Sequence, residues 1–103
     1  MSTYQEYTTA NDRKQANQLI KVMLDKGYSI SVNDGEEDTL DQSTSSKVVK
    51  DHLGTTGEDY LSFHNKEGKS LGYFWLIWCN GEDCLISDYS ANTASDEINS
   101  LLN

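Results

Sequence analysis

The fold is decided by the stretch from Tyr60 to Tyr89, YLSFHNKEGKSLGYFWLIWCNGEDCLISDY. Three segments rich in aromatic and aliphatic residues are separated there by two polar strings that contain glycine. Apolar segments bounded by turn signals are typical of strands, and short connections favour antiparallel neighbours. We therefore predict three consecutive strands, YLSFHN, SLGYFWLIWCN and CLISDY, joined by turns at KEG and NGED.

The KEG turn predicts which side chains share a face of the sheet. A type I turn followed by a glycine bulge places Leu61 and Phe63 on the core side. The residues expected with them are Leu71, Tyr73, Trp75, Ile77, Cys84 and Ile86. The opposite face would then hold Tyr60, His64, Phe74, Leu76, Trp78, Leu85 and Tyr89. That face is too apolar to be solvated, which predicts an oligomer interface formed by Phe74, Leu76, Trp78 and Tyr89.

A helix and a hairpin are predicted before this region. Apolar residues recur with the helical period between Thr9 and Gly27. YSISV then alternates as a half-buried strand, with Tyr28, Ile30 and Val32 on one face. A type I turn with Gly35 in the left-handed bulge position would set Ile30 opposite Asp38 and Tyr28 opposite Leu40, which keeps Leu40 on the apolar side.

A second helix is predicted in STSSKVVKDHLG, with Ser45 or a neighbouring residue as its cap and Gly54 as its stop. Its apolar side would hold Val48, Val49, His52 and Leu53. The segment SDEINSLLN can add a short terminal helix lined by Ile98, Leu101 and Leu102, which could cover the second sheet face, dock on another subunit or fray.

The order of elements is helix, strand, strand, helix, strand, strand, strand. It predicts a single α+β domain over residues 1–103, with an antiparallel sheet of five strands and both main helices on one face. Residues 1–8 are expected to form an N-terminal tail, and residues 90–103 a connector with the short helix.

The charge balance limits the classes of partner. Seventeen acidic and eight basic residues give a net charge of −9. Direct binding of nucleic acid or of an anionic membrane requires a basic face, which this surplus of acid does not supply. The sequence contains neither a signal-peptide pattern nor an apolar run long enough to span a bilayer, and we expect the protein in the cytoplasm.

Three acidic strings, GEED at 35–38 and GED at 57–59 and 81–83, are predicted at one end of the sheet by the alternating directions of the strands. The candidate partner-binding residues are Asp34, Glu36, Glu37, Asp38, Asp41, Glu58, Asp59, Glu82 and Asp83. They account for the whole net charge. Five strands span about 19 Å, so these nine carboxylates would give one charge per about 2 Å, against about 1.7 Å along duplex DNA. The simpler alternative is that acids and glycines serve turns and solubility.

Catalytic and metal signatures are lacking. The chain has no phosphate-binding loop, nucleophile elbow or zinc-protease motif, and its turn acids are expected to be solvated. NDGEED lacks the alternating ligands of a calcium loop, and a zinc site would need Cys79, Cys84, His52 and His64 together. We expect the cysteines to be free thiols, although a cross-strand disulfide is sterically conceivable. The prediction is a non-enzymatic protein without a cofactor.

The segments GYSISVNDGEE and LGYFWLIWCNGEDCLISDYSAN resemble small acidic accessory proteins of tailed bacteriophages and prophages. The resemblance covers about residues 27–92 and carries over no catalytic residue. It implies a bacterial cytoplasm and a product that binds a host protein, as several phage-encoded inhibitors of restriction, CRISPR or transcription do. The leading hypothesis is therefore an acidic sheet end that docks on a basic protein surface, and its alternative is a homo-oligomer, for example a dimer, joined through the second sheet face.

Overall fold

The computed structural model describes residues 8–78 and 85–102. The elements in that part of the chain are α1 (Ala10–Asp25), β1 (Ser29–Asn33), β2 (Asp38–Ser43), α2 (Ser46–Asp51), β3 (Glu58–His64), β4 (Ser70–Ile77), β5 (Ile86–Tyr89) and α3 (Thr93–Ser100). This order confirms the predicted α+β fold, including the short C-terminal helix.

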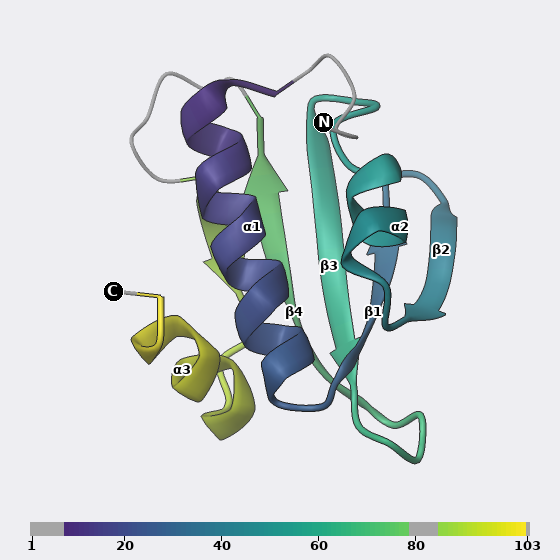
Figure 1. The fold of residues 1–103 in the computed structure, drawn as a ribbon, viewed down its shortest axis with the longest axis vertical. Coiled ribbons are helices and arrows are strands. Elements are labelled where there is room, and N and C mark those ends of the chain that lie inside the picture. The colour runs from purple at the N-terminus through teal and green to yellow at the C-terminus, as the bar shows by residue number, and fades with distance from the viewer. Residues whose placement is uncertain (1–7, 79–84, 103) are drawn as a thin grey trace.

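The five strands form one antiparallel sheet in the order β2-β1-β3-β4-β5. All three helices lie on the same side of this sheet (Figure 1). α1 crosses its middle, α2 packs over β1 and β2, and α3 contacts both α1 and β4. The core lies between these two layers. No described element covers the opposite side of the sheet, which we call the open face.

α1 forms where the apolar period predicts it. Thr9 caps it, because its hydroxyl accepts from the Asp12 amide at 3.1 Å while the Asp12 carboxylate accepts from the Thr9 amide at 3.1 Å. Gly27, with a φ of +84°, takes the left-handed position after the last turn. The apolar stripe of the helix, Ala16, Leu19, Ile20 and Met23, is fully buried in the core.

The predicted register of the first hairpin is wrong. Val32 pairs with Leu40 and Asn33 with Asp38, so the connection is a four-residue loop over 34–37. The Asp34 amide donates to the Glu37 carbonyl at 3.1 Å and closes that loop. Gly35 has the expected positive φ, +100°, and Leu40 stays on the core side because its partner Val32 is buried. The longer loop thus changes which residues of β1 and β2 pair, but it leaves Leu40 on the core side of the sheet.

The second register prediction fails for a different reason. The turn itself is confirmed, because Gly68 donates to the Asn65 carbonyl at 3.0 Å and has a φ of +83°. However, Phe63 pairs with Gly72 while the next residue, His64, pairs with Ser70. Leu71 is therefore an extra residue on β4, and this bulge reverses the side of the sheet that every later side chain of β4 faces. Phe74, Leu76 and Trp78 are buried in the core, whereas Tyr73, Trp75 and Ile77 lie on the open face.

The backbone at this bulge packs against the start of α3. A Cβ on Gly72 would lie 2.4 Å from the Ser90 Oγ and 2.7 Å from the Ser95 Oγ, so only glycine fits this close approach. Asn92 bridges the two elements: its Nδ2 donates to the Leu71 carbonyl at 3.0 Å and its Oδ1 accepts from the Ser95 amide at 2.8 Å. The second contact caps α3.

The two shorter helices differ from expectation at single positions. Ser45 caps α2, and Val49 and Leu53 are buried as predicted, but Val48 is 37% exposed. In α3, Ile98 is buried in the same core as the α1 stripe, whereas Leu101 is 55% exposed. The terminal helix thus packs on the helical side of the sheet and leaves the open face uncovered.

Candidate functional site

Two of the predicted acidic strings meet at one end of the sheet, near the top of Figure 1. The Thr56 hydroxyl donates to the Asp34 carbonyl at 3.0 Å and to the Glu58 carbonyl at 2.7 Å, which ties the β1–β2 loop to the start of β3. A Cβ on Gly35 would lie 3.2 Å from the Glu58 Oε1, so the Glu58 side chain lies close to the backbone of the β1–β2 loop. We call this group of carboxylates the acidic end; its members are Asp34, Glu36, Glu37, Asp38 and Glu58.

The carboxylates of the acidic end are held in place by local hydrogen bonds. The amides of Glu36 and Glu37 each donate to the Asp34 Oδ1 at 3.0 Å, and these bonds lower the pKa of the Asp34 carboxyl. The Asn33 side chain donates to the Asp38 Oδ1 at 3.0 Å. Glu36, Glu37 and Asp38 are exposed. The acidic end therefore presents negative charge on a loop of fixed shape.

Asp59 does not belong to this surface, which corrects the prediction. It is completely buried, because it lies in phase with the core residues Leu61 and Phe63 on β3. Its Oδ2 accepts from the Trp78 Nε1 at 2.7 Å and from the Gly54 amide at 2.9 Å, while its Oδ1 is buried and has no hydrogen-bond partner among the described residues. The two-residue period of EDYLSFH was the signal in the sequence that this acid faces inward.

The environment of Asp59 favours its protonated form. Burial raises the pKa of this carboxyl to about 6, and the negative charges of Asp34 and Glu58 act in the same direction. The hydrogen bonds from the Gly54 amide and the Trp78 indole oppose this effect and lower the pKa. Asp59 is thus a polar core residue whose charge changes near neutral pH.

Asp41 also lies apart from the acidic end. It is on the open face, where its Oδ1 accepts from the Ser31 hydroxyl at 3.3 Å. The same hydroxyl lies 2.9 Å from the His64 Nε2 and accepts from the Gln42 amide at 2.9 Å. This cluster contains the residue types of a nucleophilic site, and sequence reasoning did not identify it.

The hydrogen bonds of the cluster disfavour an activated serine. The His64 Nδ1 is buried without a hydrogen-bond partner among the described residues, so the direction of the Ser31–His64 bond is decided by Ser31. The Ser31 hydroxyl has one proton, and if it went to His64, the contact of Ser31 with the Asp41 carboxylate would join two acceptors. All three contacts of Ser31 are satisfied when His64 donates to Ser31 and Ser31 donates to Asp41. A hydroxyl that already accepts two bonds and gives its proton to a carboxylate is a structural link rather than a nucleophile.

The remaining predicted carboxylates, Glu82 and Asp83, lie outside the described residues, as do Cys79 and Cys84. Of the seven predicted acids that are described, five form the acidic end, Asp59 is buried in the core and Asp41 lies on the open face.

The predicted oligomer interface is also corrected. Phe74 and Leu76 are fully buried, Trp78 is 4% exposed, and Tyr89 stacks on Phe74 with 5.2 Å between ring centroids on the core side. The bulge at Leu71 is the physical reason. The side chains of these four residues therefore pack within the monomer and do not form an exposed interface.

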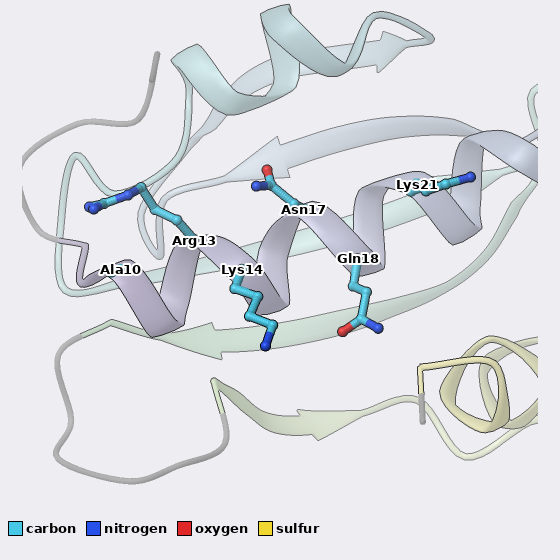
Figure 2. A pocket seen from close by; sticks show the side chains of 6 residues that line it. All are labelled: Ala10, Arg13, Lys14, Asn17, Gln18 and Lys21. Atoms are coloured by element: carbon cyan, nitrogen blue, oxygen red, sulfur yellow. The ribbon is translucent and has the colours of Figure 1, made fainter. Parts of the chain in front are cut away.

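The outer surface of α1 carries a shallow, basic depression (Figure 2). Its lining residues are Ala10, Arg13, Lys14, Asn17, Gln18 and Lys21. All come from one helix, and Figure 2 shows their side chains spreading outward from it. Because no second element supplies a facing wall, these groups do not converge on a common point. Within residues 8–78 and 85–102, no group of three or more His, Cys, Asp or Glu side chains could hold a metal ion.

Searches for related proteins give no family for the chain. No protein-family model matches it, and neither a curated protein nor a solved structure is significantly similar. In the described part of the chain, no helix combines the length and apolar character needed to cross a membrane.

Proposed function

We propose that this protein is a non-enzymatic binding protein whose acidic end docks on a basic surface of another protein. The observation that carries the proposal is the convergence of two acidic loops, fixed to each other through the Thr56 hydroxyl, at one end of the sheet. Glu36, Glu37 and Asp38 are exposed, and the hydrogen bonds of the Asp34 and Asp38 carboxylates hold the loop that carries them, so little backbone entropy is lost when a partner binds. Opposite charges also steer the encounter of two proteins.

The resemblance to phage and prophage accessory proteins supplies the biological setting of the proposal. In that setting the partner is a host protein in a bacterial cytoplasm, and its basic surface is one that normally binds nucleic acid. The acidic end would then occupy this surface as an inhibitor.

The proposal is tested by charge reversal. The variant Glu36→Lys, Glu37→Lys and Asp38→Lys changes the net charge from −9 to −3. We expect it to lose capture of basic proteins from a bacterial lysate at about 0.15 M salt, where surface charges are screened beyond about 8 Å. Wild-type capture should weaken as the salt concentration rises.

A matched control separates the acidic end from net charge in general. Asp51, Glu67 and Asp96 are exposed acids on α2, on the β3–β4 turn and on α3, and none of them is a member of the acidic end. Reversing these three gives the same net charge of −3 and should leave capture intact. Equal capture by the first variant and the wild type would refute the proposal. Equal loss of capture in both variants would also refute it, because total charge and not the acidic end would then explain binding.

A further inference from the structure

The open face has an unusual charge composition. The five strands, over residues 29–33, 38–43, 58–64, 70–77 and 86–89, contain neither lysine nor arginine. They contain five acids, of which Asp59 faces the core. The other four, Asp38, Asp41, Glu58 and Asp88, lie at exposed or half-buried positions. The open face is thus uniformly negative, in contrast to the basic outer surface of α1.

Aromatic residues occupy the centre of this negative face. Following the strand pairing across the sheet, Asp38 pairs with Asn33, Asn33 with Tyr60, Tyr60 with Trp75, and Trp75 with Asp88. One transverse row therefore contains two neighbouring aromatic rings with a carboxylate at each end. Four strand spacings of about 4.8 Å place the two ends about 19 Å apart. We call these five residues the aromatic row.

The rings of the aromatic row are ordered before any partner binds. Tyr60 and Trp75 lie parallel, with 5.7 Å between centroids and 2° between ring planes. Tyr73 also stacks on Tyr60, with 6.1 Å between centroids and 21° between ring planes. All three rings are half-buried, so part of each remains accessible. Glu58 lies two residues before Tyr60 on the same face; burial raises the pKa of the Tyr60 hydroxyl, and the charge of Glu58 acts in the same direction.

The charges decide between the two kinds of partner that an uncovered sheet face can bind. A second copy related by a two-fold axis would place these carboxylates against the same carboxylates, and like charges across an interface cost several kcal/mol. A partner with positive side chains meets complementary charge at both ends of the row. Arginine adds a planar group that stacks on aromatic rings and binds carboxylates with two parallel hydrogen bonds, which lysine does not.

We propose that the aromatic row binds arginine side chains of the basic partner, with the guanidinium groups against Tyr60 and Trp75 and their N–H groups directed to Asp38, Glu58 and Asp88. This inference rests on the proposed function, because it assigns the partner's arginines to a surface that adjoins the acidic end through Asp38 and Glu58. The acidic end supplies attraction to any cation, and the aromatic row supplies preference for arginine over lysine.

Two peptides of equal charge, nona-arginine and nona-lysine, separate these contributions. We expect isothermal titration at 0.15 M salt to show nona-arginine bound about five- to twenty-fold more tightly by the wild type, from two ring contacts of about two- to five-fold each. The variant Trp75→Leu removes one of the two ring contacts and should reduce this ratio to about two- to five-fold, while the affinity for nona-lysine stays within about two-fold. The variant Glu36→Lys with Glu37→Lys should instead weaken both peptides alike.

The wild type alone provides a second measurement that does not depend on the folding of a variant. In its amide spectrum, nona-arginine should shift residues 60, 75 and 88, and nona-lysine should shift mainly residues 34–38. Equal binding of the two peptides, with no change in Trp75→Leu, would overturn the inference and leave the proposed function standing. If the wild type bound neither peptide, both the inference and the proposed function would be refuted. The inference would also be overturned if sedimentation showed a dimer for the wild type and a monomer for Trp75→Leu, because a second copy would then occupy the open face.

Discussion

Replacing Asp59 by asparagine should change how the stability of the protein depends on pH. The carboxyl has a pKa of about 6 in the folded protein and an ordinary value of 3.8, a difference that corresponds to about 3 kcal/mol. Because the folded state binds this proton more tightly, the contribution of Asp59 is most favourable below about pH 3.8. It is lost as the pH rises from there to about 6, and it is constant above that range.

The assay is urea unfolding followed by far-ultraviolet circular dichroism between about pH 3.5 and 7.5, on the wild type and on Asp59→Asn. Subtracting one free energy of unfolding from the other cancels the titration of the other carboxyls. The variant should gain about 3 kcal/mol relative to the wild type between the two ends of the range. A difference that stays constant with pH would refute the reasoning.

A companion variant tests the cause of the pKa value. Trp78→Phe removes the indole N–H that donates to the Asp59 Oδ2 at 2.7 Å, and this bond favours the charged carboxylate. The pKa of Asp59 should therefore rise further, so the pH-dependent range should extend above pH 6. An unchanged range in Trp78→Phe would show that the indole does not stabilise the ionised form.

Three further substitutions test the packing described above. Gly72→Ala places a Cβ 2.4 Å from a serine hydroxyl and should cost about 2–4 kcal/mol in urea unfolding, whereas Gly57→Ala, with nothing within 4 Å, should change stability by less than about 1 kcal/mol. Thr9→Ala removes the capping box of α1 and should cost about 1 kcal/mol; a loss below about 0.3 kcal/mol would contradict that role. Thr56→Val removes the hydroxyl that reaches the Asp34 carbonyl and should speed amide hydrogen exchange over residues 34–37, and unchanged exchange would show that the loops hold independently.

The sequence was informative wherever local periodicity and caps decide the structure. The α1 stripe, the cap near Ser45 and the glycine turn at Gly68 were all predictable, because each depends on a few neighbouring residues. The position of the acidic end followed from antiparallel connectivity, which fixes the end of the sheet at which each loop lies. The predicted set of acidic surface residues wrongly included Asp59, although the alternation of β3 that turns this residue inward was visible in the sequence.

The registers could not be predicted because non-local contacts decide them. Leu71 becomes a bulge because Gly72 must lie against side chains near α3, some twenty residues later in the chain. Turn chemistry gives no information on that contact. One extra residue on β4 moved the residues of the predicted interface into the core and the predicted core residues of β4 to the open face. The position of Trp75 beside Tyr60 on the open face therefore emerged only from the strand pairing.

The bulge has a consequence for the fidelity of folding. β4 is apolar on both sides, so a chain that paired it one residue out of phase would bury Tyr73, Trp75 and Ile77 and lose little hydrophobic free energy. Selection between these two states must then come from groups that fit only one of them. The hydrogen bond of Trp78 to Asp59 and the tight seat of Gly72 are such groups. A buried carboxyl that weakens the native state at neutral pH thereby helps to discriminate it from its nearest competitor.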